Sequence, residues 1–458
     1  MEMAATGIYW NYAPAVSVPQ DIRWGRTYEG YSEDTALVSE LAVAYLQGMQ
    51  GEDLTLPDTV IGTPKHFVGD GGAVWGTSTT GDYQIDQGVT DVDEETLRAV
   101  HLPPYTAVVE AGAESIMISY SSWGGMKMHA QRYLIEDVLR GELGFDGFIV
   151  SDWAGVDQIT PDYYDAVVAS INAGVDMNMV PYDYNRFIQV MTEAVEAGDI
   201  SEERIDEAVR RILTAKLKLG LFEQPFSNPD YLPLVGSDEH RAVAREAVAK
   251  SAVLLKNEGD LLPFSPDLPL LLVGGAAADD IGIQSGGWTI EWQGGTGNIT
   301  PGTTILAGLT EAVGENTAVV YDPFGRFNDV DLPSDQPRTC LAVVGEQPYA
   351  EGLGDDPNLR LPVNDLRLLG RMSEVCDQLA VVLLSGRPLI IADQLADWDA
   401  LVAAWLPGTE GQGVADVLLG TRPFTGQLSY TWPRETLGES EAEPLFPRGF
   451  GLTTGTSD

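Results

Sequence analysis

Short apolar runs alternate with longer amphipathic stretches along the first half of the chain. The apolar runs predict buried strands over residues 7–14, 60–68, 115–120, 147–151 and 177–180. Between them, apolar residues recur at helical spacing and predict helices over residues 34–50, 131–143, 164–173, 187–197 and 201–219. Ser201, followed by two glutamates, is the expected N-cap of the last helix. This alternation is typical of parallel β/α architecture and indicates part of a (β/α) barrel.

A proline-rich segment separates the two halves. Residues 222–236 hold three prolines and no periodic pattern, which predicts a linker. Residues 237–256 then predict a long amphipathic helix, and buried strands are expected over residues 268–273, 318–321, 341–344, 379–384 and 401–405. The fold class is therefore α/β: a partial (β/α)8 TIM-type barrel over residues 1–221, the linker 222–236, and an α/β sandwich over residues 237–458.

The charge of the chain is strongly one-sided. It carries 69 acidic and 26 basic residues, for a net charge of −43. The acids are scattered rather than gathered in blocks, which is typical of a solvated acidic surface. Acid-rich, lysine-poor surfaces suit proteins that stay soluble in concentrated salt, so a halophilic source is expected. The same charge argues against binding to nucleic acid or to an anionic membrane.

Targeting signals are not evident in the chain as given. No stretch approaches about 18 uninterrupted apolar residues, so no transmembrane helix is predicted. The first residues lack a positively charged start followed by an apolar run, which argues against a signal peptide. The chain as given would therefore be cytoplasmic, but the sequence leaves the compartment of the protein open.

Cys340 and Cys376 are the only cysteines and lie far apart in the sequence. Neither belongs to a Cys-x-x-Cys motif or to a metal-ligand spacing. Two separate core thiols are expected, rather than a disulfide or a zinc site. No His-rich or Asp-x-Asp spacing suggests another metal.

Polar residues that follow directly on apolar runs are the candidates for chemistry, because barrel active sites lie at the carboxyl ends of the strands. Asp152, in the run Phe148–Trp153, is a candidate nucleophile or metal ligand. An N-cap of the next helix is an equally good interpretation of that aspartate alone. Lys65 and His66 end another strand, where they could donate charged hydrogen bonds to sugar hydroxyls; a solvated turn is the alternative.

Three loops add further candidates. Arg23 and Arg26 flank Trp24-Gly25, and Arg26 could grip a pair of hydroxyls, whereas Arg23 fits a structural pair with an acid. Trp288 and Trp292 lie in a glycine-rich loop, which suits stacking on sugar rings more than burial in a core. Glu346 and Glu351 follow a strand of the second half, as a general acid or as solvated charges.

Together these stretches resemble glycoside hydrolase family 3, in its plant-type β-D-glucan exohydrolase branch. The similarity covers essentially the whole chain, in family order, through the motifs DIRWGRTYEGYSED, KHFVGDGG, ISYSSWGGMKMHA, GFIVSDWAGVD, GGWTIEWQGGTG, VVGEQPYAE, LVAAWLPGTEGQGVADVLLG and PLFPRGFGLTT. The resemblance implies a retaining β-glucosidase that needs no cofactor or metal.

The resemblance also implies roles for individual residues. Asp152 is the expected nucleophile and Glu351 the expected acid/base, whereas Glu346 matches a non-catalytic position. The expected sugar-binding residues are Arg26, Lys65, His66 and Tyr120, with Trp153 and Trp292 as an aromatic clamp, and Asp70 and Met128 in supporting roles. A retaining enzyme requires two carboxyl groups roughly 5–5.5 Å apart. Lys65 and Arg26 are expected to lower the pKa of the Asp152 carboxyl, while nearby tryptophans keep Glu351 protonated.

The chain departs from the family pattern at its start. Residues 5–14 match a strand well inside the family's barrel, and the aspartate that grips the terminal glucose has no counterpart here. A glutamate of the plant members falls near Thr79, with Asp82 as a possible substitute, and an arginine is replaced by Gln158. A missing N-terminal segment or a partner chain is expected to complete the barrel, because open strand edges are unfavourable. The chain alone is expected to be poorly soluble or inactive.

The function predicted from these features is an exo-acting release of glucose from the non-reducing end of β-glucans or β-glucosides, through a covalent glycosyl-enzyme intermediate. A β-xylosidase of the same family is the first alternative, and a non-catalytic carbohydrate-binding remnant is the second. An N-acetylglucosaminidase is disfavoured, because that branch places a histidine where this chain has Asp70. Full-length relatives are often secreted or periplasmic.

Overall fold

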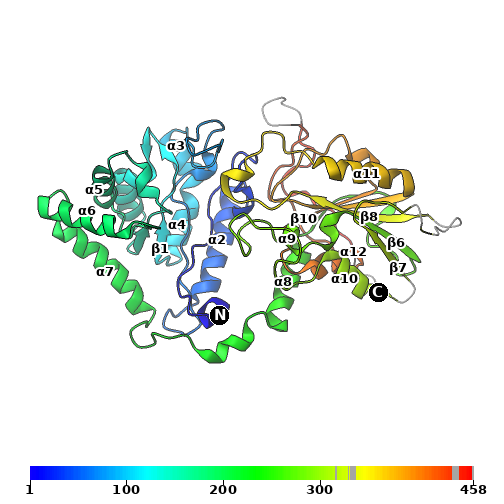
Figure 1. The fold of residues 1–458 in the computed structure, drawn as a ribbon, viewed down its shortest axis with the longest axis horizontal. Helices are drawn as coiled ribbons and strands as arrows, with labels where there is room; N and C mark the ends of the chain where they lie inside the picture. The colour runs from blue at the N-terminus through cyan, green and yellow to red at the C-terminus, as the bar shows by residue number, and fades with distance from the viewer. Residues whose placement is uncertain (315–316, 328–329, 331–336, 436–442, 456–458) are drawn as a thin grey trace. The chain divides into compact units, whose positions relative to one another are not determined.

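A computed structural model of the chain describes residues 1–314, 317–327, 330, 337–435 and 443–455. The chain divides into two compact units, Met1–Gly236 and Ser237–Asp458 (Figure 1). Segment 222–236 contains the 3-10 helix Pro229–Leu234, which contacts α1 (Glu2–Ala5). The backbone N–H of Gly236 also donates to Glu2, so this segment is held against the first unit.

Five parallel segments lie side by side in the first unit, in chain order. β1 (Ser115–Met117) and β4 (Phe148–Val150) form a regular parallel pair. Single parallel bridges join the others: Trp10 to Ile61, Ala15 to Lys65, Phe67 to Ile118 and Val150 to Met177. The expected strands 7–14, 60–68 and 177–180 are thus wrong as regular strands. Pro14 and Pro64 lack the N–H that a continuous ladder needs.

Helices accompany these segments, and most of the predicted ones are confirmed with small shifts. Ser201 caps α7 by accepting from the N–H of Arg204, as expected, and Asp34 caps α2 by accepting from that of Leu37. The stretch predicted at 131–143 is a π-helix, Tyr133–Glu142. The α-helices of this unit beyond α1 are α2 (Thr35–Gln50), α3 (Glu94–Thr96), α4 (Pro103–Glu110), α5 (Tyr163–Ala173), α6 (Tyr184–Ala197) and α7 (Glu202–Lys218).

The core of the first unit lies between the parallel segments and the helices. Phe67, Ile116 and Ile149 come from three neighbouring segments and are buried together with residues of α2 and the π-helix. A hairpin of β2 (Ser122–Trp123) and β3 (Met126–Lys127) turns through two glycines with positive φ. Each parallel segment is therefore fixed by packing as well as by its few backbone bonds.

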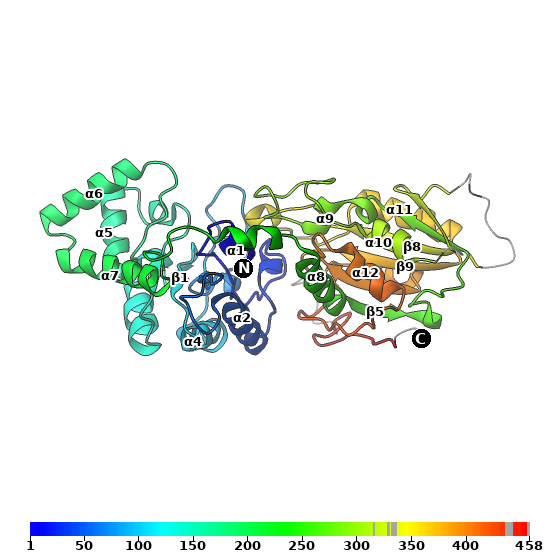
Figure 2. The same cartoon turned by 90° about the horizontal axis from the view of Figure 1, so that it is seen from below.

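One sheet organises the second unit (Figure 2). Its strand order is β5-β10-β9-β8-β6-β7, all parallel except β5, which runs antiparallel to β10. The strands are β5 (Val253–Asn257), β6 (Leu270–Gly274), β7 (Ala318–Asp322), β8 (Thr339–Gly345), β9 (Gln378–Leu384) and β10 (Ala400–Trp405). The helices are α8 (Asp238–Ser251), α9 (Ile281–Ser285), α10 (Ile305–Ala312), α11 (Val363–Val375) and α12 (Gly411–Leu418). The α/β class is confirmed.

The prediction of one helix over 237–256 is wrong at its end. Helix α8 stops at Ser251, and Val253–Asn257 forms the edge strand β5. Val253, Leu254 and Leu255 are all buried, and the apolar run was compatible with either a buried helix or a strand. These residues form a strand because they pair with β10.

The prediction of two separate thiols is also wrong, because Cys340 and Cys376 form a disulfide. Strand β8 lies beside β9, and Cys340 is in register with Leu379. Cys376 lies shortly before that strand, so the fold brings the two α-carbons to 5.9 Å. That distance lies within the range found for disulfides. Because the two cysteines are 36 residues apart, nothing in the sequence indicated that they are neighbours.

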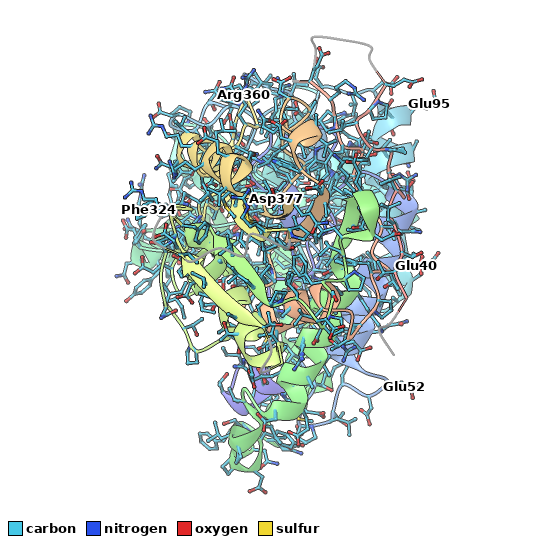
Figure 3. All side chains as sticks on the ribbon, turned by 90° about the vertical axis from the view of Figure 1, so that its right-hand side faces the viewer. Glu40, Glu52, Glu95, Phe324, Arg360 and Asp377 are labelled. Atoms are coloured by element: carbon cyan, nitrogen blue, oxygen red, sulfur yellow. A yellow bond between two sulfur atoms is a disulfide. The ribbon has the colours of Figure 1, made fainter. Side chains whose placement is uncertain are left out.

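Charged side chains extend from the surface of both units (Figure 3). Glu40, Glu52 and Glu95 are exposed, in keeping with a solvated acidic surface. Among the residues with described positions, no helix is long and apolar enough to span a membrane.

Candidate active site

The sequence motifs of the first unit meet at one edge of its parallel segments. Lys65 and His66 follow the bridge at Ile61, Tyr120 follows β1, and Asp152 follows β4. Because these segments are parallel neighbours, their carboxyl ends lie together, which is where barrel enzymes carry their chemistry.

His66 links this edge to two charged groups. A guanidinium can only donate, so the 3.1 Å contact between Arg26 Nη2 and His66 Nε2 makes Nε2 the acceptor. The proton then lies on Nδ1, which donates to Asp70 Oδ2 at 2.9 Å. Burial, with the charges of Arg26 and Lys65, holds the pKa of His66 well below its usual value. We conclude that His66 is a neutral ring of fixed orientation.

Asp70 supports that ring. Its carboxylate also accepts from the hydroxyl of Ser17 at 2.7 Å and from the backbone N–H of Gly71 at 2.9 Å. Burial raises the pKa of Asp70, although these hydrogen bonds oppose the shift. These contacts fix the Asp70 carboxylate beside His66, and its supporting role in the site stays a prediction.

Arg26 is buried and bound to an acid that the sequence account did not single out. Its Nε and Nη2 each donate to Glu29 at 2.8 Å, in a bidentate pair. Burial alone would raise the pKa of Glu29, but the charge and hydrogen bonds of Arg26, with the charge of Lys65, lower it to about 2. The spacing of three residues between Arg26 and Glu29 was the available signal. Arg23 instead pairs with Asp21, as expected for a structural arginine.

Asp152 is held on several sides and does not cap the next helix. Its backbone N–H donates to His129 Nε2 at 3.0 Å, and its Oδ1 accepts from the N–H of Trp153 at 2.7 Å. Its Oδ2 lies 3.6 Å from His66 Nε2. The following 3-10 turn, Gly155–Gln158, has Ala154 at its N-cap and no side-chain cap. The capping interpretation is therefore wrong, and a mostly buried carboxylate lies at the strand end.

Tyr120 and Trp153 are joined at this edge. The hydroxyl of Tyr120 donates to the backbone oxygen of Trp153. The Trp153 side chain is 53% exposed and meets Tyr182 edge-to-face, with ring centroids 6.1 Å apart. An exposed indole beside a buried carboxylate can stack on a sugar ring.

In the second unit, the remaining candidates follow β6 and β8. The chain leaves β6 toward β7 on one side, whereas β8, β9 and β10 follow on the other side. The carboxyl ends of β6 and β8 thus form the switch point where open α/β sheets bind ligands. Trp292 lies in the loop after α9, in the connection from β6 to β7, and Glu346 and Glu351 lie in the loop after β8.

Glu346 and Glu351 differ in their surroundings. Glu346 Oε1 accepts from Arg387 Nε and Nη2 at 3.1 Å each, and its Oε2 accepts from the backbone N–H of Gly386. These contacts make it a structural residue of the loop, and sequence reasoning missed Arg387. Glu351 begins a 3-10 helix, Glu351–Gly354, with φ of 55°, in the left-handed region that few side chains adopt.

The two loops are bound to each other by Gln293, another residue that the sequence account missed. Its side-chain oxygen accepts from the backbone N–H of Ala350 at 2.9 Å, one residue before Glu351. Trp288 and Trp292 are 47% and 51% exposed, in keeping with the predicted glycine-rich stacking loop. The acid and the tryptophan thus belong to one connected surface of this unit.

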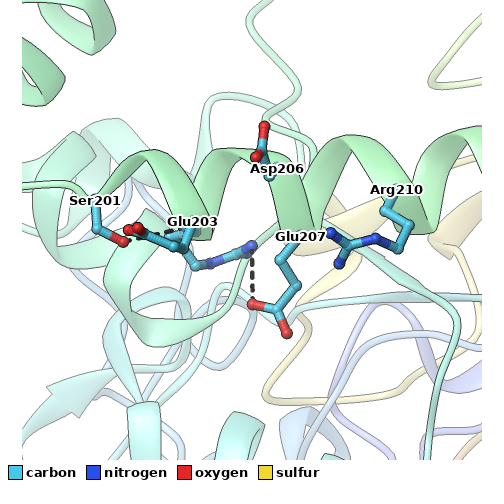
Figure 4. Close-up of a pocket in the computed structure, with 6 residues that line it drawn as sticks. Ser201, Glu203, Asp206, Glu207 and Arg210 are labelled. Atoms are coloured by element: carbon cyan, nitrogen blue, oxygen red, sulfur yellow. Dashed lines mark hydrogen bonds and ion pairs between the residues drawn. The ribbon is translucent and has the colours of Figure 1, made fainter.

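A hollow along helix α7 lies apart from these motifs (Figure 4). It is lined by Ser201, Glu203, Arg204, Asp206, Glu207 and Arg210, all on or beside a single helix. Arg204 pairs with Glu207 across it. None of the candidate residues lines this hollow. In the described part of the chain, no group of three or more His, Cys, Asp or Glu side chains is arranged to hold a metal ion.

The chain belongs to glycoside hydrolase family 3. Residues 1–215 match the profile of the "Glycosyl hydrolase family 3 N terminal domain", and residues 252–454 match that of the "Glycosyl hydrolase family 3 C-terminal domain". The family resemblance predicted from the motifs is confirmed.

Three similar proteins illustrate this membership. A lysosomal beta glucosidase of Dictyostelium discoideum is 31% identical over 99% of this chain and 59% of its own length. A beta-xylosidase of Formosa agariphila is 32% identical over 99% of this chain and 68% of its own length. The structure of an exo-1,3/1,4-beta-glucanase from a Pseudoalteromonas species superposes with a TM-score of 0.90 at 40% identity, covering 99% of this chain and 75% of that one. This chain therefore spans about three fifths of the first relative.

Proposed function

We propose that this protein is a retaining, exo-acting β-glucosidase, with Asp152 as nucleophile and Glu351 as acid/base. The observation that carries the proposal is the placement of Asp152. Its carboxylate is 9% exposed, follows a buried strand, and lies 3.6 Å from the neutral ring of His66. A buried carboxylate at a strand end, held by specific partners, is the usual setting of a catalytic group.

The proposed reaction has two steps. The Asp152 carboxylate attacks the anomeric carbon while Glu351 protonates the departing glycosidic oxygen, which breaks the bond and leaves a glucosyl ester on Asp152. Glu351, now ionised, takes a proton from water, and that water displaces Asp152 from the sugar. The sugar keeps its β-configuration because the anomeric carbon is inverted twice.

Four residues of the first unit are proposed to bind the terminal sugar. Lys65 and Arg26 would donate charged hydrogen bonds to hydroxyls, and His66 and Tyr120 would complete that site. The half-exposed rings of Trp153 and Trp292 would stack on the next sugar unit of a β-linked glucan. Ring stacking discriminates poorly between linkages, so several β-linkages would be accepted.

Hydrolysis of an aryl β-glucoside tests this function. The complete gene product that carries this chain should release glucose whose first-formed anomer, followed by NMR, is β. Asp152→Asn should lower the rate about 1,000-fold or more. Glu351→Gln should slow substrates with poor leaving groups far more than activated ones, because only the former need a proton. An α-anomer formed first would overturn the retaining mechanism.

A β-xylosidase is the second candidate, favoured by the similarity to the Formosa agariphila enzyme. Aryl β-xyloside and aryl β-glucoside compared at equal concentration distinguish the two. If kcat/KM is higher for the xyloside than for the glucoside, the protein is a xylosidase rather than a glucosidase. The proposed roles of Asp152 and Glu351 would be the same.

We further propose that another polypeptide segment, from the same gene product or a partner chain, completes the barrel. The five parallel segments leave two open edges among the described residues, at Trp10 and at Met177. Large apolar side chains on α6 and α7, including Ile188 and Leu217, are more than half exposed. Unpaired strand edges and exposed apolar helix faces are normally covered by another part of the protein or by a partner.

A further inference from the structure

A fully buried histidine lies directly behind the proposed nucleophile. His129 is 0% exposed and belongs to the 3-10 turn Met128–Ala130, after the β2–β3 hairpin. Its Nε2 is 3.0 Å from the backbone nitrogen of Asp152. A backbone N–H can only donate, so Nε2 accepts, and the proton of the neutral ring lies on Nδ1.

The surroundings fix this ring and keep it an acceptor. A Cβ added at Gly155 would lie 2.4 Å from both Cε1 and Nε2 of His129, so the turn after the nucleophile packs closely on the ring. Burial, and then the charge of Lys127, lower the pKa of His129 to about 3. The amine of Lys127 is itself anchored to the backbone oxygen of Tyr120 at 2.9 Å.

The hydrogen bond from Asp152 to His129 differs from those of the neighbouring backbone N–H groups. Ser151 and Ala154, on either side of Asp152, donate their backbone N–H groups to the backbone oxygens of Met177 and Met179. The N–H of Asp152 is instead directed to His129. The orientation of that peptide determines where the Asp152 carboxylate lies relative to His66.

We infer that His129 is a positioning residue, which holds the backbone of Asp152 so that its carboxylate faces the anomeric carbon. The inference rests on the proposed function of Asp152. His129 itself need not touch the sugar, because its contact is to the main chain of the nucleophile. Its contribution should therefore appear in the rate of glycosylation rather than in the binding of the sugar.

Substitution of the acceptor tests this inference. In His129→Phe a ring of similar size fills the space but cannot accept the Asp152 N–H. Trapping of the complete gene product with a 2-fluoro-glucoside should then slow about 10- to 100-fold, with a nearly unchanged dissociation constant for the reagent. His129→Gln supplies an oxygen acceptor and should recover most of the rate. Leu139→Met, a change within the core of the same unit at a residue with no part in the site, should react like the wild type.

A spectroscopic measurement tests the hydrogen bond without relying on activity. In protein labelled with nitrogen-15 at histidine, the His129 signals are those absent from His129→Gln. At pH 7 they should report a neutral ring with its proton on Nδ1. A proton on Nε2, or wild-type trapping rates in His129→Phe, would overturn the inference. If the wild type is not trapped, the proposed function is overturned instead. The spectrum would then still show whether His129 Nε2 accepts the hydrogen bond from Asp152.

Discussion

At the scale of single residues, the surroundings of Asp152 are consistent with a nucleophile. Trp153, His66 and His129 each contact a different part of it: one oxygen, the other oxygen and the backbone N–H. Two of these three contacts come from histidines held neutral by burial and nearby cations. The His129 ring holds the main chain of Asp152 by accepting from its N–H, whereas Nε2 of His66 carries no proton and lies beside the carboxylate without donating to it.

The pair of Arg26 and Glu29 predicts a pH dependence of stability. The pKa of Glu29 is lowered to about 2, so its contribution is complete above its usual pKa near 4.5 and is lost as pH falls toward 2. Glu29→Gln should unfold more easily than the wild type at pH 7 by about 3 kcal/mol. By pH 3 about 2 kcal/mol of that difference should be gone.

Urea unfolding at pH 7, 5 and 3 measures this difference. Glu40→Gln, a change of an exposed acid on α2, is the matched control and should stay within about 0.5 kcal/mol of the wild type at each pH. A difference between Glu29→Gln and the wild type that is constant from pH 7 to pH 3 would contradict the assigned ion pair.

The sequence singled out the candidate site residues but not the residues that hold them. Asp152, Lys65 and His66 follow apolar runs, and strand ends are visible in the pattern. Glu29, His129, Gln293 and Arg387 act through contacts that only the folded chain creates, such as the 3.0 Å bond from His129 to a residue 23 positions away. His129 and Gln293 accept from backbone N–H groups, which no side-chain motif reveals, whereas Glu29 and Arg387 pair with charged side chains.

At the scale of elements, two loops of the second unit hold each other. The loop after α9 contacts the loop after β8 through Gln293 and Ala350. Gly294, with φ of 71°, approaches the same place: an added Cβ would lie 2.4 Å from the backbone oxygen of Gly286 and 2.9 Å from Pro348 Cβ. The apolar runs predict five strands of this unit, whereas they place β5 at the end of a helix, and this loop contact depends on strand order.

Gly294→Ala should therefore destabilise the protein by about 1–3 kcal/mol more than Gly297→Ala. Gly297 has a similar positive φ of 85° but nothing within 4 Å of its added Cβ, so it controls for backbone strain alone. Urea midpoints compare the two variants. Equal midpoints would show that the loops do not pack as described.

The disulfide between Cys340 and Cys376 constrains β8 and the end of α11. Closing a loop of 36 residues should contribute about 3–4 kcal/mol. Reductant should lower the urea midpoint of the wild type and leave that of the double variant Cys340→Ala/Cys376→Ala unchanged. Alkylation of both cysteines in native, unreduced protein would contradict the disulfide.

At the scale of the whole molecule, the net negative charge should determine how the stability of the protein depends on salt. A net charge of −43 repels itself in dilute buffer, and salt screens that repulsion over a Debye length of about 3 Å at 1 M. The thermal midpoint should therefore rise when potassium chloride increases from about 0.1 M to 3 M. Differential scanning fluorimetry over that range, with an ordinary near-neutral protein as control, checks this expectation. A midpoint that falls with salt would argue against adaptation to concentrated salt.

The central claim of the proposed function concerns one covalent bond, between Asp152 and the anomeric carbon of the sugar. Asp152 should become esterified when the complete gene product is incubated with a 2-fluoro-glucoside that carries a good leaving group. Mass spectrometry of peptic peptides should find the added fluoroglucosyl group on the peptide containing Ser151-Asp152-Trp153, and none in Asp152→Asn. Label on any other residue, or full hydrolytic activity without label, would contradict the assignment of Asp152 as the nucleophile.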